Sequence, residues 1–106
     1  MNGKNYKVII SDRAKAMIGT HISFLAKDSK EAAREKKKEI ITAIQTLSEM
    51  PERFPYFDED YIQRNTYHKI FISKWYIVLY QIKDEYVYVD YVLDCRRDYN
   101  WLMGFQ

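Results

Sequence analysis

The chain is poor in several residue types, and each shortage excludes a class of protein. Its 106 residues include one cysteine, three glycines, two prolines and two histidines. A single cysteine cannot form an internal disulfide, so a reducing, cytoplasmic setting is expected. The three glycines are not clustered, which excludes a Gly-rich phosphate loop. The apolar runs are too short for a signal-peptide core or a membrane span, so no membrane partner is expected.

The length and composition of the chain indicate a single domain, residues 1–106. Hydrophobic side chains make up 47% of the chain, which is enough for a single core. The formal net charge of +2 is mild. It permits an anionic partner without predicting one, because nucleic-acid binders are marked by a cluster of cations rather than by their total.

Hydrophobic periodicity predicts a strand and then a helix at the start of the chain. Residues 6–11 are rich in β-branched side chains, which indicates a short strand. Ser11 and Asp12 supply the N-cap of a helix that ends near Lys27. Steps of three and four residues place one stripe of this helix in the core. The stripe consists of Ala14, Met17, Ile18, His21 and Leu25.

A second, longer helix follows, and a loop comes after it. Asp28 and Glu31 stand three apart, as in a variant of the capping box. The helix stops at Met50, because the residue before Pro51 is pushed out of the helical region. Its apolar side runs through Ala33, Ile40, Ile44 and Leu47. Residues 51–65 hold two prolines and several aromatics and are expected to form the loop.

The remaining part predicts an antiparallel meander of three strands, in residues 66–72, 75–82 and 85–94, joined by short polar breaks. This order of elements predicts an α+β domain in which a two-helix hairpin packs on one face of an antiparallel sheet. By strict alternation, one face of the last strand consists of Val87, Val89, Tyr91 and Leu93. Neither face of the two longer strands is clearly polar, so the second face of the sheet should also be covered. The cover would be the C-terminal segment or a partner protein, and the alternative is that this face carries ordinary exposed tyrosines.

Few residues are placed for metal or nucleophilic chemistry. His21 and His68 have no second histidine or carboxylate at metal-ligand spacing, so no metal and no other cofactor is expected. His21 is expected to be a hydrogen-bonded core residue, and Cys95, at a strand end, to pack rather than to react. The basic run of the second helix, Arg34 and residues 36–38, alternates with glutamates. Such mixing is typical of a solvated helix face.

A basic and aromatic cluster accompanies the meander. It consists of His68 and Lys69 on the first strand, Lys74 in the first turn, and Arg96, Arg97, Tyr99 and Trp101 after the last strand. Both outer strands can flank the middle one, so these groups can converge on one end or face. Arg96, Lys74 and Trp101 would then bind a nucleic acid or another target. The alternative is that Arg96 and Arg97 form ion pairs with Asp94 and Asp98, and the spacing does not separate the two interpretations.

At these residues the chain resembles the RelE/ParE superfamily of toxins from bacterial type II toxin–antitoxin modules. The similarity spans Tyr6 to Met103. It rests on the helix exit MPERFP, the hairpin YHKIFISKWYIVLYQI and the ending RRDYNWL, in this order. The resemblance implies helices over an antiparallel sheet, which agrees with the periodicity. It also implies an antitoxin that covers the toxin, and one of two targets. RelE-type toxins cut messenger RNA on the ribosome, whereas ParE-type toxins poison DNA gyrase.

The resemblance also implies catalytic residues for a RelE-like nuclease. Arg97 matches the arginine that ends the last strand of such nucleases, and Lys69 or His68 matches their basic residue on the second strand. Cleavage without a metal also needs a proton acceptor and a proton donor, which His68 or Tyr99 would supply. Tyr99 stands earlier than the C-terminal tyrosine of the pattern, which would fall near Met103. Where these nucleases carry an arginine on the third strand, this chain has Ile77, and Cys95 stands where many relatives have glycine.

Because the charged nuclease set is incomplete, we predict a growth-inhibiting toxin of a plasmid-stabilisation module that inhibits gyrase without cleaving RNA. Two alternatives stay open: a ribosome-dependent mRNA interferase, and a toxin-derived binding module without activity. The expected partners are a cognate antitoxin and either gyrase or the ribosome with its mRNA.

Overall fold

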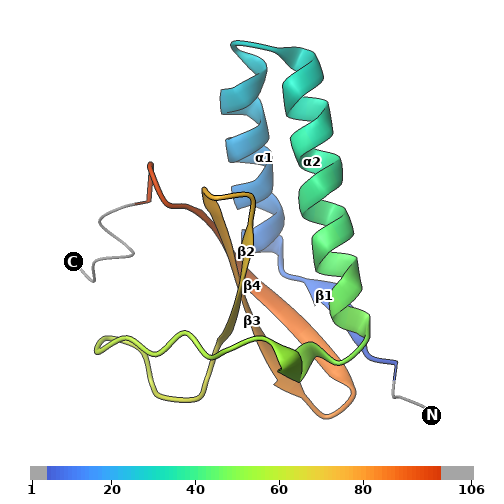
Figure 1. Cartoon of the computed structure of the whole chain (residues 1–106), viewed down its shortest axis with the longest axis vertical. Helices are drawn as coiled ribbons and strands as arrows, with labels where there is room; N and C mark the ends of the chain where they lie inside the picture. Colours follow the sequence, from blue (N-terminus) through green and yellow to red (C-terminus); the bar gives the residue numbers. More distant parts are fainter. Residues whose placement is uncertain (1–4, 99–106) are drawn as a thin grey trace.

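The computed structural model describes residues 5–98, and its elements follow the predicted order. They are β1 (Lys7–Ile10), α1 (Asp12–Ala26), α2 (Lys30–Gln45), the short 3-10 helices η1 (Thr46–Ser48) and η2 (Pro51–Arg53), β2 (His68–Ile72), β3 (Tyr76–Lys83) and β4 (Tyr86–Asp94). The two α-helices form a hairpin beside a twisted sheet (Figure 1). The predicted α+β class is therefore confirmed.

Serine hydroxyls begin both α-helices. Ser11 Oγ accepts a hydrogen bond from the Ala14 amide at 3.0 Å, as predicted. In α2 the cap is Ser29, whose Oγ accepts from the Ala32 amide at 3.0 Å, rather than Asp28. After α2 and η1 the backbone of Met50 is left-handed, with φ of 47°. This conformation turns the chain away from the helix axis before Pro51.

The strands form one sheet in the order β1-β4-β3-β2. β2, β3 and β4 make the predicted antiparallel meander. β1 pairs with β4 in parallel, so the complete sheet is mixed. Parallel strands cannot be joined by a tight turn, and here β1 and β4 are separated in the chain by the helix hairpin, the loop, β2 and β3.

The main core lies between the helix hairpin and one face of the sheet. The predicted helix stripes are buried there, including Ala14, Ile18, Ile40, Ile44 and Leu47. They pack on the strand residues Val78, Tyr80, Val87, Val89 and Val92, each 0% exposed. The Tyr80 hydroxyl donates to the Pro51 carbonyl at 2.7 Å, which fastens η2 to the sheet.

A β-bulge at Asp90 changes which residues of β4 share a face. Tyr80 pairs with Val89 and Leu79 with Tyr91, so Asp90 is the extra residue on β4. The predicted grouping of Val87 and Val89 with Tyr91 and Leu93 is therefore wrong. Beyond the bulge, Val92 faces the helices, whereas Tyr91 and Leu93 face the other side. One inserted residue reverses the alternation that a regular strand would have.

The second face of the sheet carries a smaller core of its own. Phe57 in the loop before β2 packs there against Ile77, Leu79 and Leu93, and all four are at most 5% exposed. The loop is held to β2 by hydrogen bonds from Phe57 N to Tyr67 O at 2.7 Å and from Lys69 N to Pro55 O at 2.9 Å. This loop, rather than a partner protein, covers that part of the face. The C-terminal segment, the other predicted cover, lies outside the described residues.

Candidate functional site

The turn after β2 and the end of β4 meet at one end of the sheet. The Cys95 amide donates to the Trp75 carbonyl at 2.7 Å and fixes the two segments side by side. The Arg96 guanidinium lies 4.8 Å from the centroid of the Trp75 ring, and the Lys74 ammonium lies 5.9 Å from it. Trp75 is 41% exposed. The structure thus brings the predicted residues Lys74 and Arg96 together on an exposed indole.

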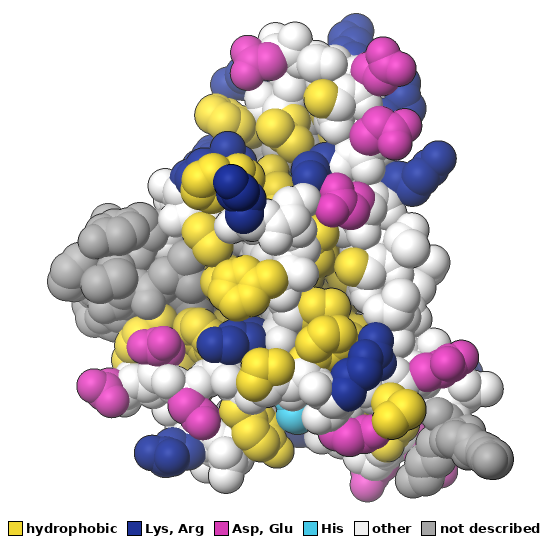
Figure 2. All heavy atoms as spheres, in the orientation of Figure 1, with side chains coloured by type: hydrophobic (Ala, Val, Ile, Leu, Met, Phe, Trp, Pro, Cys, Tyr) yellow, Lys and Arg dark blue, Asp and Glu magenta, His cyan; other side chains and the backbone are white. Residues whose placement is uncertain are grey.

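Exposed hydrophobic side chains are mixed with cations on one face of the molecule. Figure 2 shows this face, where hydrophobic groups lie at the surface of both the helix hairpin and the sheet, with Lys and Arg side chains among them. The large hydrophobic residues that are exposed on β2 and in the turn after it are Phe71 and Trp75, at 55% and 41%. Such a mixture suits contact with an anionic or amphipathic surface.

Asp94 holds Arg96 in its position over the Trp75 ring. The carboxylate accepts hydrogen bonds from the Arg96 amide at 2.8 Å and from Nε and Nη2 at 3.2 Å each. Asp94 is 1% exposed. Burial alone would raise the pKa of Asp94, but the hydrogen bonds from Arg96 outweigh it, and the pKa lies below its ordinary value. The predicted ion pair with Asp94 is therefore confirmed for Arg96.

Arg97 takes a different environment from its neighbour. Its guanidinium lies 4.3 Å from the centroid of the Phe24 ring on α1. Asp98, the predicted ion-pair partner, instead accepts a hydrogen bond from the Asp94 amide at 2.8 Å and lies 3.8 Å from His21 Nε2. Within residues 5–98 no carboxylate pairs with Arg97. The ion-pair prediction is wrong for this residue because α1 draws its side chain away.

His21 and Cys95 belong to the scaffold of the site. His21 is 4% exposed, and its Nε2 lies 2.8 Å from the Val92 carbonyl, so the predicted hydrogen-bonded core role is confirmed. Burial, assisted by the negative charge of Asp94, raises the pKa of the Cys95 thiol. A neutral thiol is a weak nucleophile, which agrees with the expected packing role.

His68 and Lys69 do not join the cluster. His68 begins β2, four residues from the end that meets Lys74, a distance of about 13 Å along a strand. It is 7% exposed, lies between the rings of Tyr56 and Tyr80 at centroid distances of 4.2 and 5.4 Å, and donates from Nδ1 to the Phe54 carbonyl at 2.7 Å. The Lys69 ammonium lies 5.8 Å from the Phe57 ring, on the other face of the sheet.

The remaining positions of the predicted nuclease pattern carry no charge or lie outside the described residues. Ile77 is 5% exposed and belongs to the second core. Tyr99, Trp101 and Met103 lie beyond residue 98, where the description ends.

Sequence reasoning missed a polar cluster around the bulge. Asp90 Oδ2 accepts from the Tyr67 hydroxyl at 2.9 Å and from Gln81 Nε2 at 2.7 Å. Burial, with the hydrogen bond to Asp90, raises the pKa of Tyr67 to about 12. Arg13 donates from Nε to the Asp90 carbonyl at 3.2 Å and stacks on Tyr91 at 4.0 Å. The signal in the sequence was that Asp90 and Gln81 interrupt otherwise apolar strands.

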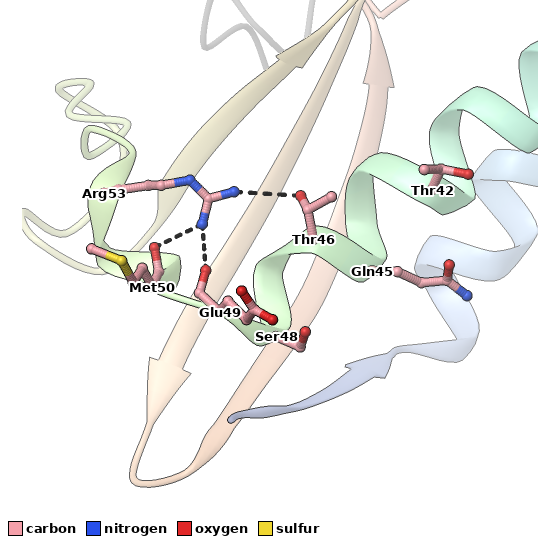
Figure 3. Close-up of a pocket in the computed structure, with 7 residues that line it drawn as sticks. All are labelled: Thr42, Gln45, Thr46, Ser48, Glu49, Met50 and Arg53. Atoms are coloured by element: carbon pink, nitrogen blue, oxygen red, sulfur yellow. Dashed lines mark hydrogen bonds between the residues drawn. The ribbon is translucent and has the colours of Figure 1, made fainter. Parts of the chain in front are cut away.

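Among the hollows that the described residues form, two of the larger ones lie along the helices. The first, about 500 Å³, is at the end of α2 (Figure 3). Arg53 there donates to the carbonyls of Glu49 and Met50, so its guanidinium holds the connection between η1 and η2. The second is an apolar groove of about 440 Å³ along the helix hairpin, with lysines at its margin. It is lined by Ile10, Ile18, Ile22, Ile41, Lys15 and Lys37, with Gly19 and Ser23.

Neither a metal cluster nor a membrane helix is found in the part of the chain that the structure describes. No three His, Cys, Asp or Glu side chains there come together as a metal site would need. None of the helices there combines the length and the apolar character that crossing a bilayer requires.

The architecture places the chain among small α+β domains with a helix hairpin over a sheet, and a solved structure shares it. That structure is described as the chromosomal ParDE TA system from P. aeruginosa; the match has a TM-score of 0.70 and 9% identity over 84% of this chain and 95% of that chain. At such an identity the likeness shows the fold alone. A comparison with curated proteins finds no match.

The sequence itself shows the family. Residues 8–99 match the family model of the ParE toxin of the type II toxin–antitoxin system parDE. The chain therefore belongs to the ParE family of type II toxins, a family whose members are paired with an antitoxin.

Proposed function

We propose that this ParE-family chain inhibits growth by binding DNA gyrase, without cleaving nucleic acid. The observation that supports the proposal is the chemistry of the meander end. Among residues 5–98 it offers the cations Lys74, Arg96 and Arg97 and the indole of Trp75, while His21 and Tyr76 at the same end are buried, at 4% and 1% exposed. His68 lies about 13 Å away along β2, in a stack of aromatic rings.

Cleavage of RNA without a metal needs more than cations. A base must take the proton of the 2′-hydroxyl, and an acid must protonate the leaving oxygen, each contributing about 10²–10⁴-fold. The charge that builds on phosphorus also needs donors on more than one side. Ile77 supplies a buried aliphatic side chain at the position of the third-strand arginine. The described residues are thus better suited to hold an anionic or protein surface than to break a phosphodiester bond.

The antitoxin of the proposed pair requires a surface of its own, and the groove along the helix hairpin suits it. Ile22 and Ile41 are partly buried and face an open apolar hollow. Lys15 and Lys37 at its margin favour an apolar segment that carries acidic residues at its edges. An Ile22→Glu variant should lose affinity for the antitoxin, measured by calorimetry, while its circular dichroism stays unchanged.

The target is tested with purified components. The chain is incubated with gyrase and supercoiled plasmid, and linear DNA that is trapped by the enzyme is measured on a gel. In parallel, primer extension on mRNA after induction reports in-frame cuts. We expect trapped DNA and an induced DNA damage response with intact mRNA. In-frame cuts without a damage response would refute gyrase inhibition and support the mRNA interferase. Arg97 favours that alternative, since it forms no ion pair with another of residues 5–98.

Arg97 should matter for either target, since it is an exposed cation without an ion pair among the described residues. We expect Arg97→Ala to abolish growth inhibition and to leave the melting temperature unchanged. Arg34→Ala, an exposed arginine on α2, is the matched control and should stay toxic. A toxic and well-folded Arg97→Ala variant would show that the wrong residue has been chosen. If the unaltered chain leaves growth untouched when expressed without its antitoxin, it is a binding module without activity.

A further inference from the structure

Arg97 forms one wall of a hollow that lies on the outer face of α1. The hollow has a volume of about 480 Å³ and is lined by Ala16, Gly19, Thr20, Ser23, Phe24, Lys27 and Arg97. The residues from α1 recur at steps of three and four, so they share one face of the helix. A Cβ built on Gly19 would meet nothing within 4 Å, so there is free space next to this residue. We call this set the α1 pocket.

Two cations of the α1 pocket share one aromatic ring. The Arg97 guanidinium lies 4.3 Å and the Lys27 ammonium 5.7 Å from the centroid of Phe24. Neither cation forms an ion pair within residues 5–98. The nearest acidic residues in sequence do not neutralise them, since Asp28 forms no ion pair there and Asp98 accepts the Asp94 amide. Two cations beside one ring, without a carboxylate partner among the described residues, make this part of the surface positively charged, which favours the binding of an anion.

The other groups of the pocket are those that proteins use for phosphates. Thr20 and Ser23 are exposed, and each has a hydroxyl that can donate to a phosphate oxygen. Phe24 is 43% exposed, so its side chain can be reached from solvent. Nucleic-acid proteins combine such donors with rings on which bases stack.

A second ring with two cations lies at the same end of the sheet. Arg96 and Lys74 lie over Trp75, although Arg96, unlike Arg97, is ion-paired with Asp94. Arg96 and Arg97 are consecutive, so their Cα atoms are about 3.8 Å apart. The two pairs of cations are therefore connected through neighbouring residues, and a nucleic-acid strand offers several phosphates that could bind them.

We propose that the α1 pocket binds a backbone phosphate of a single-stranded nucleic acid, with a base stacked on Phe24 and the strand continuing toward Trp75. This inference goes beyond the proposed function and does not depend on gyrase as the target. It assigns roles to Lys27, Thr20 and Ser23, which no motif in the sequence indicates.

The test measures anisotropy of short fluorescein-labelled strands, oligothymidine and oligouridine, titrated with the purified chain at several salt concentrations. We expect Lys27→Gln and Arg97→Gln each to weaken binding roughly tenfold, the loss of one charged contact. Each should also reduce the slope of log K against log salt by about 0.7. Phe24→Ala should weaken binding at high salt as well, because stacking is not screened. Lys38→Gln on α2 removes the same charge outside the pocket and should bind normally.

Three outcomes would overturn the proposal. The first outcome is that the unaltered chain binds neither strand. The second is that Lys38→Gln loses as much affinity as Lys27→Gln, which would mean that only the overall charge matters. The third outcome is that polyglutamate, at equal concentration of charge, displaces the oligonucleotide from the unaltered chain, which would identify an acidic protein segment as the ligand. Circular dichroism of each variant separates a lost contact from a lost fold.

Discussion

Replacing Asp94 by asparagine should destabilise the chain in a way that depends on pH. Asp94 is 1% exposed and binds both the amide and the guanidinium of Arg96. The asparagine side chain would keep one acceptor oxygen but lose the charge and bring an amide group that donates where Arg96 also donates. The perturbation therefore removes the charged hydrogen bonds while it conserves the volume of the side chain.

The magnitude follows from the contacts. A hydrogen bond to a charged group contributes about 1.5–3 kcal/mol. The Arg96 side chain is 42% exposed, so its charge can return to water in the variant and is not stranded. We therefore expect a loss of about 2 kcal/mol, the lower part of the range for charged contacts. For a domain of this size, 2 kcal/mol corresponds to a decrease of roughly 10 °C in the melting temperature.

The dependence on pH has a definite direction. The pKa of Asp94 is lower in the folded chain than its ordinary value of 3.8. Stability from a lowered carboxyl pKa is present above the unfolded pKa and is lost as the pH falls through the folded pKa. Urea unfolding of the unaltered chain and of Asp94→Asn should therefore differ by about 2 kcal/mol at neutral pH, and the difference should shrink below about pH 4.

An exposed acidic residue provides the control. Asp60→Asn, in the loop before β2, should leave the free energy of unfolding within about 0.5 kcal/mol of the unaltered chain. The reasoning is refuted if Asp94→Asn is as stable as the unaltered chain at neutral pH. It is also refuted if the difference between the two chains is the same at all pH values, since the destabilisation would then come from packing rather than from the charge.

Three further substitutions test the scaffold of the site. Tyr80→Phe should lower the free energy of unfolding by about 1–2 kcal/mol in urea, because it leaves the Pro51 carbonyl without its donor; an unchanged value would mean that water replaces the hydroxyl. His68→Gln keeps a donor for the Phe54 carbonyl and should stay toxic in a growth assay, whereas a general acid or base at this position would make the variant harmless. Ile77→Arg places a charge in the second core, where the described residues offer no partner, so it should cost about 3 kcal/mol or more in thermal unfolding and should not create RNA cleavage.

The helices and strands followed from the sequence because their signals are local. The predicted stripe of the second helix is buried, with Ala33, Ile40 and Ile44 in α2 and Leu47 in η1, since a helix with that spacing has only one apolar face to bury. The Ser11 cap and the meander are local in the same sense: a hydroxyl reaches an amide three residues away, and short polar turns join neighbouring strands. No local signal marks the bulge at Asp90, because a bulge depends on the register of the facing strand.

In the candidate site, too, some features follow from local sequence and others depend on tertiary packing. That Lys74 and Arg96 meet was foreseeable, because a turn and a strand end of one meander must lie close together. The order of residues 94–98 made Asp94 and Asp98 equally suitable partners for the two arginines. Only the packing of α1 against β4 decides which arginine forms an ion pair. In the folded chain Arg97 lies over Phe24, and Asp98 lies beside His21.

The sequence by itself determined the class of fold, the helix stripes and the family, since periodicity and motif order are properties of neighbouring residues. The tertiary structure alone decided the faces of β4, the cover of the second face and the α1 pocket. These features join segments far apart in the chain, Phe24 and Lys27 with Arg97, Phe57 with Ile77 and Leu93. Their proximity depends on how helix, loop and sheet pack together, and the spacing within any one segment does not encode it.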